Sequence, residues 1–262
     1  MLTSSTSLSE ADVVLKLRAA GCVFAEDEAR LLFAAATSAE ELLGMVDRRV
    51  AGTPLEYVLG WAEFFGLRIA VDPTVFVPRR RTEFLVRQAI SLGVPGALVV
   101  DLCCGSGAVG VAIASGLDRA VLHASDVDPA AVRCARRNLL PVGGRVHEGD
   151  LYDSLPDSLR GHVDILAVNA PYVPTDAIAL MPPEARLYEA RVALDGGVEG
   201  IDVQRRVAAT AQQWLTPSGH LLIETSEQQA ALTRAACAEA GLLARAVESD
   251  DGMGTTVVIA TG

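Results

Sequence analysis

Between residue 97 and the end of the sequence, short β-type runs alternate with helical segments, and this alternation limits the possible folds more than any other feature. The expected strands lie at residues 97–101, 121–125, 145–148, 163–168, 220–224, 242–247 and 255–260. The expected helices lie at residues 108–115, 129–139, 200–215 and 227–240. Strands that alternate with helices through short links form a largely parallel sheet with both faces covered. Residues 248–254 are too few for a parallel crossover, so the last strand is expected to run antiparallel.

Composition divides the chain into three parts. Residues 1–52 carry three apolar patterns of helical spacing, two of them opened by capping-box sequences at residues 7–10 and 38–41. Residues 53–78 set aromatic and β-branched residues between glycines and prolines, which is typical of a β-hairpin. We therefore expect a small N-terminal helical domain at 1–52 and a β-hairpin linker at 53–78. The α/β domain is expected at 79–262, where a helix at residues 82–92 precedes the first strand.

The composition argues against several classes of protein. Half of the 262 residues (50%) are hydrophobic, which suits a globular protein with a sizeable core. No apolar run reaches about 18 residues and no signal peptide is recognisable, so no membrane span is expected. The odd number of scattered cysteines, 5, is typical of free thiols in a reducing cytoplasm. The net charge of −11 disfavours nucleic acid as a partner, since the only dense basic cluster is Arg79-Arg80-Arg81.

A glycine loop follows the first expected strand and opens a helix. Residues 103–110 read C-C-G-S-G-A-V-G, directly after the strand that ends at Asp101. In a doubly wound sheet ligands bind at this edge, and glycine lets the backbone approach them closely. The loop alone leaves a dinucleotide site open. Its two adjacent thiols lack a second pair or a nearby histidine to complete a zinc set, so no metal is expected.

Acidic residues also close the next two expected strands. Asp126 ends the second strand, and Asp150 follows the third. Any one of these carboxylates could be an ordinary helix N-cap. Together with Asp101 and the glycine loop, however, they complement a ribose diol and a charged amino-acid tail better than a pyrophosphate. The set therefore predicts S-adenosylmethionine as the ligand.

Several segments, taken in order, carry a resemblance to one family. They include "VVDLCCGSGAVGVAIA", "ASDVDPAAVRCARRNL", "GDLYDSLP", "VNAPYVPT" and "LYEARVALDGGVEGIDVQRR". The chain resembles the class I S-adenosylmethionine-dependent methyltransferases over about residues 53–260. More narrowly, it is similar to the protein-(glutamine-N5) methyltransferase family, which modifies peptide-chain release factors. The implied fold is α/β: a doubly wound, seven-stranded, mostly parallel sheet with an antiparallel last strand.

The resemblance also implies a cofactor, a partner and a set of contacts. The cofactor is S-adenosyl-L-methionine, and the partner is a protein, a release factor with a Gly-Gly-Gln loop, gripped in part by the N-terminal helices. A cytoplasmic monomer is expected. The implied cofactor contacts are Asp101, Cys103, Cys104, Gly105, Ser106, Gly107, Asp126, Val127, Asp150, Leu151 and Asn169.

The segment "NAPY", residues 169–172, is the expected catalytic site. A carboxamide nitrogen is a poor nucleophile, so it must be held with its lone pair in line with the methyl group. Two acceptors can hold its N–H groups: the side-chain oxygen of Asn169 and the backbone carbonyl of Ala170. The same acceptors stabilise the positive charge that grows on nitrogen. Tyr172 offers a flat face to the planar amide, and Pro171 biases Ala170 toward extended conformations.

The family pattern at this site is N-P-P-Y, whereas this chain has N-A-P-Y. Alanine at 170 keeps the carbonyl and loses only the ring, so the expected reaction is preserved. Two alternatives stay open. One is an adenine-N6 or other nucleic-acid amino-methyltransferase, because N-x-P-Y sites also serve exocyclic amino groups. The other is a catalytically altered relative that acts on an unknown substrate.

Overall fold

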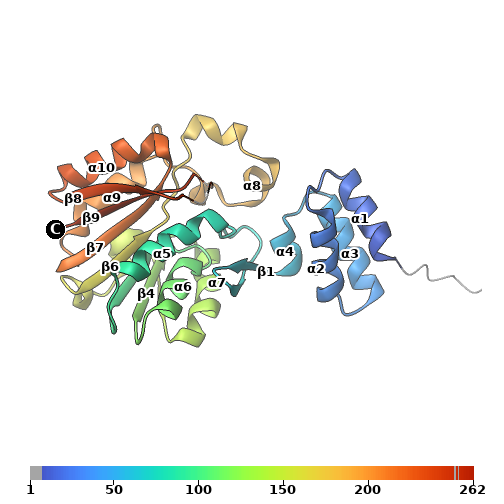
Figure 1. Ribbon diagram of the computed structural model, residues 1–262, viewed down its shortest axis with the longest axis horizontal. Helices are drawn as coiled ribbons and strands as arrows, with labels where there is room; N and C mark the ends of the chain where they lie inside the picture. The colour runs from blue at the N-terminus through green and yellow to red at the C-terminus, as the bar shows by residue number, and fades with distance from the viewer. Residues whose placement is uncertain (1–7, 251, 253) are drawn as a thin grey trace, which may run out of the picture.

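The protein is built around one seven-stranded sheet, which Figure 1 shows in a computed structural model that describes residues 8–250, 252 and 254–262. The strand order is β5-β4-β3-β6-β7-β9-β8. The strands are β3 (Leu98–Leu102), β4 (Val121–Asp126), β5 (Arg145–Glu148), β6 (Val163–Val168), β7 (Leu215–Thr225), β8 (Leu243–Glu248) and β9 (Thr256–Thr261). The pairs from β5 to β7 are parallel, while β9 runs antiparallel to both β7 and β8. The expected fold class is confirmed.

Helices cover both faces of this sheet. One face carries α5 (Glu83–Leu92), α6 (Ala108–Gly116) and α7 (Pro129–Leu139), and the other carries α9 (Asp202–Ala211) and α10 (Ala230–Glu239). Successive strand residues point to opposite faces, so Val99 packs in the first core and Val100 in the second. Burial on both sides explains why the central strands β3 and β6 read as largely apolar runs.

The strand order reverses beside β3, and this reversal positions the site. β3 pairs with β4 on one side and with β6 on the other. In this register Leu102 lies opposite both Ser125 and Val168. The segments that follow these three parallel strands therefore emerge together at one edge, where a doubly wound sheet binds its ligands.

Three helices form a bundle at one end of the molecule, far from the C-terminus (Figure 1). They are α1 (Glu10–Ala19), α2 (Ala25–Ala35) and α3 (Ala39–Val50). The capping box of α1 is formed by Ser9 and Asp12, not by the pattern at residues 7–10, whose first residue lies outside the described residues. Ser38 caps α3 by accepting from the Glu41 amide at 3.1 Å, but the Glu41 carboxylate bonds to Thr37. Only half of that expected capping box is present.

The segment expected to be a hairpin linker begins instead with a short helix, α4 (Leu55–Leu59). The hairpin follows as β1 (Trp61–Phe64) and β2 (Leu67–Ala70), joined by a two-residue turn with positive φ at Phe65 (53°) and Gly66 (71°). The expectation missed α4 because five residues carry little helical periodicity. It forms here because it buries Tyr57 and Val58 in two separate cores. No helix in the described ranges is both long and apolar enough to cross a membrane.

Two other expected boundaries are wrong. The helix expected at 200–215 is shorter, because α9 ends at Ala211 and the next residues turn to bury Trp214 between the sheet and Tyr152. The strand expected at 220–224 is longer, because β7 already pairs with β6 at Leu215 and resumes after a register shift. A bulge of this kind accommodates Pro217 and Gly219 within the strand.

One arginine of the N-terminal bundle contacts a helix of the α/β body. Arg49 on α3 is buried, and its guanidinium donates to Glu28 at 2.6 Å and to Glu184 at 2.7 Å. Glu184 belongs to α8 (Pro183–Tyr188), which lines the main cavity. Glu28 lies in the same bundle and is buried with Arg49, whereas the Glu184 side chain is 51% exposed. The ion pair between the bundle and the cavity wall therefore has one half-exposed partner, and it contributes less to stability than a fully buried pair can.

Candidate active site

A cavity of about 450 Å³ lies at the edge where β3, β4 and β6 end. Its wall brings together nearly all the residues that the sequence singled out: Asp101, Cys103, Cys104, Gly105, Ser106, Asp126, Val127, Asp150, Leu151, Asn169, Ala170, Pro171 and Tyr172. Gly107 is the exception and does not line the cavity. A Cβ atom at Gly107 would lie 2.4 Å from the Leu139 side chain, so this glycine serves helix packing behind the loop.

The glycine loop turns sharply between β3 and α6. Cys103, Gly105 and Gly107 all have positive φ (57°, 55° and 78°), which is favourable only for the two glycines. The Cys104 amide donates to the Ser125 carbonyl at 3.1 Å, and the Gly105 amide donates to the Asp126 carboxylate at 2.8 Å. The loop is therefore fastened to the end of β4, and the strain at Cys103 is held by those bonds.

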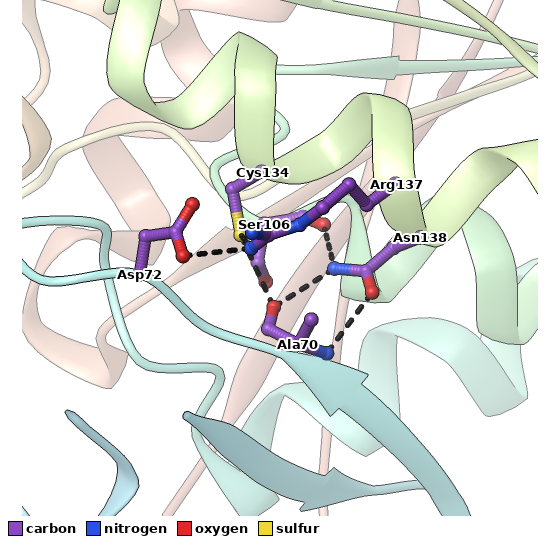
Figure 2. A network of polar contacts seen from close by, with 6 residues as sticks. All are labelled: Ala70, Asp72, Ser106, Cys134, Arg137 and Asn138. Carbon is purple, nitrogen blue, oxygen red and sulfur yellow. Dashed lines mark hydrogen bonds and ion pairs between the residues drawn. The ribbon is translucent and has the colours of Figure 1, made fainter. Parts of the chain in front are cut away.

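A network of polar contacts supports the loop from outside the cavity (Figure 2). The Asn138 side chain on α7 donates to the Ser106 carbonyl at 2.8 Å and to the Ala70 carbonyl at 2.9 Å. Its oxygen accepts from the Ala70 amide at 2.9 Å, and the Cys134 thiol also reaches the Ala70 carbonyl. One asparagine thus joins the end of the hairpin to the glycine loop. The sequence analysis gave Asn138 no role.

The three aspartates that line the cavity differ in burial and in their partners. Asp101 is only 1% exposed, accepts from the Gly110 amide at 2.8 Å, and has its pKa raised to about 7 by burial. Burial also raises the pKa of Asp126, which the amides of Asp128 and Gly105 partly offset. Asp150 is half-exposed and pairs with Arg206 at 2.6 Å. The hydrogen bonds that Asp101 and Asp126 accept within the protein therefore offset only part of the cost of burying their negative charge.

This donor set fits S-adenosylmethionine. A cation or a hydroxyl donor would stabilise the ionised form of a buried carboxylate whose pKa is raised. The cofactor carries an ammonium, a sulfonium and a ribose diol, which are groups of these kinds. The apolar side chains of Val127 and Leu151 line the same cavity and suit a purine ring. The Gly110 position is also required, because a Cβ there would lie 3.0 Å from the Asp101 carboxylate that its amide binds.

Cofactor affinity should depend on pH through Asp101. With its pKa raised to about 7, the neutral acid is favoured below that pH, and a bound cation must expel the proton. By linkage, affinity should rise about tenfold from pH 6 to about pH 8. Folding stability depends on pH in the opposite direction to cofactor affinity. Protonated Asp101 favours the folded state at low pH, and this contribution is lost as the pH rises through about 7. Calorimetry in buffers of different ionisation enthalpy should detect the released proton, and Asp101→Asn should flatten the profile. A sloping profile in that variant would contradict the assignment.

The loop after β6 is held by a second loop, residues 194–200. The Val173 amide donates to the Leu194 carbonyl at 3.0 Å, and the Gln229 side chain donates to the Tyr172 carbonyl at 2.9 Å. A Cβ atom at Gly200 would lie 2.3 Å from that same Tyr172 oxygen. The segment "LDGGVEG" was part of the resemblance but had no structural role in the sequence analysis. It sets the backbone path of residues 169–173.

Two consecutive residues of the cavity wall, Asn169 and Ala170, carry hydrogen-bond acceptors. The Asn169 side-chain nitrogen donates to the Thr82 hydroxyl at 3.4 Å, which turns the side-chain oxygen away from Thr82. Ala170 is 1% exposed overall. Within the described residues, neither its carbonyl nor the Asn169 side-chain oxygen accepts a hydrogen bond. Both acceptors therefore lack a partner among the described residues, which is what binding the two N–H groups of a planar amide would require.

Charged residues surround Tyr172. The Arg81 guanidinium donates to the Tyr172 hydroxyl, lies 5.8 Å from its ring centre, and is 3.7 Å from the Glu224 carboxylate. Arg79 instead pairs with the buried Glu189 at 2.6 Å. The sequence analysis noted the arginine cluster without a role and missed Glu224. The one sequence signal for Glu224 was its position as the last residue of the strand expected at 220–224.

Comparison with known proteins identifies chains of similar sequence and fold. Residues 80–201 match the family model described as "Methyltransferase small domain". The described fold is similar to a methyltransferase from Pyrococcus furiosus, with a TM-score of 0.57 and 16% identity over 75% of this chain and 89% of that one. At that identity the likeness supports the fold alone.

Curated relatives are more similar in sequence. The chain is 39% identical to a release factor glutamine methyltransferase of Geobacter sulfurreducens, over 71% of this chain and 66% of the relative. It is 38% identical to that of Streptomyces coelicolor, over 71% and 67%. It is also 37% identical, over 71% and 65%, to a 4-amino-L-phenylalanine/4-methylamino-L-phenylalanine methyltransferase of Streptomyces pristinaespiralis. The matches span about two thirds of each relative's length. With its methyltransferase fold and these relatives, the chain belongs to the release factor glutamine methyltransferase family of S-adenosylmethionine-dependent methyltransferases.

Proposed function

We propose that this methyltransferase modifies the side-chain amide nitrogen, N5, of a glutamine in a protein, and that the protein is a peptide-chain release factor with a Gly-Gly-Gln loop. The observation that carries the proposal is the pair of adjacent acceptors, the Asn169 side-chain oxygen and the Ala170 carbonyl. A primary amide has two N–H groups in one plane, which two neighbouring acceptors can bind together. The relatives named for release factors support the same substrate.

The cofactor would be held by the residues at the strand ends. In this proposal Asp126 binds the ribose diol, and Asp101 binds the ammonium. The glycine loop presents its backbone, and Val127 and Leu151 flank the adenine. Bound there, S-adenosylmethionine supplies an electrophilic methyl group. The ion pair with Arg206 would hold the Asp150 carboxylate at the polar edge of the adenine site.

The substrate amide would be oriented by the protein alone. The acceptors at 169 and 170 fix both N–H groups, so the nitrogen lone pair points along a single direction. Holding reactants in this way can lower a barrier by roughly 7–11 kcal/mol in favourable cases. As the new bond forms, positive charge grows on nitrogen and strengthens both hydrogen bonds. Tyr172 packs against the amide plane, and no strong base is needed because the proton leaves to water afterwards.

Different parts of the chain would bind the cofactor and recognise the protein substrate. We assign cofactor binding and catalysis to residues 79–262, and recognition of the protein substrate to the helices of residues 1–52, with 53–78 as the link. The contact between Arg49 and Glu184 supports this division, because it connects the helical bundle to a wall of the cavity. The Asn138 network supports it as well, because it connects the hairpin to the glycine loop.

Parallel incubations with labelled cofactor test the proposal. A release factor, a variant with its loop glutamine replaced by alanine, duplex DNA and 4-amino-L-phenylalanine would each be offered to the enzyme. We expect label on the release factor and none on the glutamine variant. The amino acid is included as a second candidate, because one relative of similar identity is named for it. Label on DNA or on the amino acid alone would refute the release-factor assignment.

Replacing Ala170 with proline should preserve or raise activity. The substitution keeps the carbonyl that the chemistry uses. It removes an amide that donates no hydrogen bond within the described residues, and it narrows the backbone freedom before Pro171. Turnover of the release factor by wild type and by Ala170→Pro is the measurement. A collapse of turnover in a folded variant would mean that the site is shaped for a different substrate.

A further inference from the structure

The backbone of Tyr172 is fixed by hydrogen bonds, but these bonds do not fix its ring. The Tyr172 carbonyl accepts from the Gln229 side chain at 2.9 Å, and the next amide, of Val173, donates to the Leu194 carbonyl at 3.0 Å. Such bonds leave the side-chain torsions to their rotamer preferences. The ring lines the cavity and is only partly buried. A contact at the far end of the side chain is therefore what can hold its orientation.

Arg81 makes that contact at the Tyr172 hydroxyl. Its guanidinium donates a hydrogen bond to the hydroxyl oxygen, and its central carbon lies 5.8 Å from the centre of the ring. That distance is near the outer limit of about 6 Å for attraction between a cation and an aromatic face. The hydrogen bond to the hydroxyl is therefore the main tether of the ring.

Arg81 is in turn anchored to the sheet. Its side chain is 45% exposed, while its Nε atom lies 3.7 Å from the carboxylate of Glu224, whose side chain is 2% exposed. Burial raises the pKa of Glu224 and the charge of Arg81 lowers it, so the arginine favours the ionised carboxylate. Glu224 lies on β7, which pairs with β6 on one side and β9 on the other. The anion therefore holds the arginine from a fixed position.

The three adjacent arginines of this segment have different partners. Arg79 pairs with Glu189 at 2.6 Å. Arg80 is exposed, and its guanidinium has no hydrogen bond or ion pair with any residue that the structure describes. Arg81 binds the Tyr172 hydroxyl. The cluster therefore contains one residue in contact with the catalytic segment and, directly beside it, a matched control.

From these contacts we propose that Arg81 is a positioning residue that holds the Tyr172 ring in the orientation that packs against the substrate amide. The inference rests on the proposed function, which gives the ring that substrate. Hydrogen bonds to residues 169 and 170 would hold one edge of the amide and leave it free to tilt about that edge. A fixed ring against its face prevents the tilt. A misplacement of about 1 Å can cost roughly 100-fold in rate, so this restraint matters for turnover.

The charge of Arg81 has the wrong sign to stabilise the proposed reaction directly. Positive charge grows on the substrate nitrogen, and a cation at the cavity wall opposes it. The buried carboxylate of Glu224 beside the guanidinium offsets part of that opposition. The benefit of Arg81 must therefore pass through the Tyr172 hydroxyl, and it should disappear when the hydroxyl is absent.

A double-mutant cycle tests this dependence. Arg81→Met removes the donor and keeps an unbranched side chain, and Tyr172→Phe removes the hydroxyl and keeps the ring. Each should lower kcat on the release factor by at least about tenfold, with no loss of cofactor affinity. The double variant should be no slower than either single variant, because the same contact is missing in all three. Arg80→Met should turn over as the wild type does. Losses that multiply in the double variant would overturn the role of Arg81.

Nuclear magnetic resonance gives a readout that needs no substrate. The chain contains 4 tyrosines, so tyrosine labelled with ¹³C at the ζ carbon gives few signals, and Tyr172→Phe identifies its own by removing it. This carbon bears the hydroxyl, so we expect its signal to shift in Arg81→Met and not in Arg80→Met. An unmoved signal in Arg81→Met would overturn the tether.

Failure of this inference can be told from failure of the proposed function. A release factor that the wild-type enzyme leaves unmodified would refute the proposed function. If the wild type modifies the release factor and Arg81→Met, with an unchanged melting temperature, does so at the same rate, only the role of Arg81 is refuted.

Discussion

Replacing Asn169 with alanine should lower kcat for methyl transfer by at least about 100-fold, equivalent to ~2.7 kcal/mol of barrier, while cofactor binding remains measurable. The variant loses one of the two acceptors that fix the substrate amide, and the Ala170 carbonyl alone leaves the amide free to rotate. The lost acceptor also no longer stabilises the charge that develops on nitrogen. Single-turnover kinetics with saturating cofactor would isolate this effect from binding.

Alternative causes of a slow Asn169→Ala variant can be separated. The variant should keep the wild-type melting temperature within a few degrees, because the lost bond to Thr82 is long, at 3.4 Å. Its dissociation constant for the cofactor should also be measured directly. Turnover near the wild-type rate would contradict the two-acceptor mechanism, since no other side chain in the account takes that role.

Replacing Asp126 with alanine should weaken S-adenosylmethionine binding by a factor of at least ten, about 1.4 kcal/mol. The carboxylate is the proposed ribose ligand, and it also receives the amides of Gly105 and Asp128 at 2.8 and 2.9 Å. Its loss therefore removes a ligand contact and loosens the glycine loop. Titration calorimetry gives the affinity, and kcat at saturating cofactor should change less than the affinity does.

The control for Asp126→Ala is a carboxylate of the same type outside the cavity. Asp157→Ala suits this purpose, because its side chain is 89% exposed and pairs only with the nearby Arg160. It should bind the cofactor as wild type does. Unchanged affinity in Asp126→Ala would remove the ribose assignment. Asp126→Ala and Asn169→Ala also control each other, because one should act on binding and the other on turnover.

The sheet could be predicted because its physical signal is local. Strands buried on both faces must be apolar at consecutive positions, and β6 was placed with its observed boundaries. The antiparallel last strand followed from the length of one connection. The short helix α4 could not be predicted in this way. Its five residues are helical because Tyr57 and Val58 are buried in two cores, which is a property of the tertiary fold.

The cavity wall could also be predicted in large part, because parallel strands bring their ends to one edge. Asp101, Asp126 and Asn169 all lie there as expected. The supporting residues could not, because their partners are distant in sequence. Asn138 lies 68 residues from Ala70, and Thr82 lies 87 residues from Asn169. Gly107 was assigned to the cofactor because it stands in the loop, although its position serves packing against Leu139.

The substitution of alanine for proline at 170 illustrates the same limit. The sequence marks residue 170 as a departure from the family pattern, but only the structure relates it to its surroundings. Its carbonyl remains without a hydrogen bond in the described residues, beside the Asn169 oxygen. The loop at 194–200 holds the neighbouring backbone at Val173, and the Gln229 side chain holds it at the Tyr172 carbonyl. The carbonyl that the proposed reaction uses is therefore present without the proline ring.

The central claim is that this site methylates the amide nitrogen of a protein glutamine, and tandem mass spectrometry tests it most directly. A release factor would be incubated with S-adenosylmethionine and either wild-type enzyme or Asn169→Ala, and then digested. The account predicts one added methyl group on the glutamine of the Gly-Gly-Gln loop, located on the side-chain nitrogen by fragmentation, with the wild type alone. An unmodified glutamine with the wild-type enzyme, or equal modification with Asn169→Ala, would contradict it.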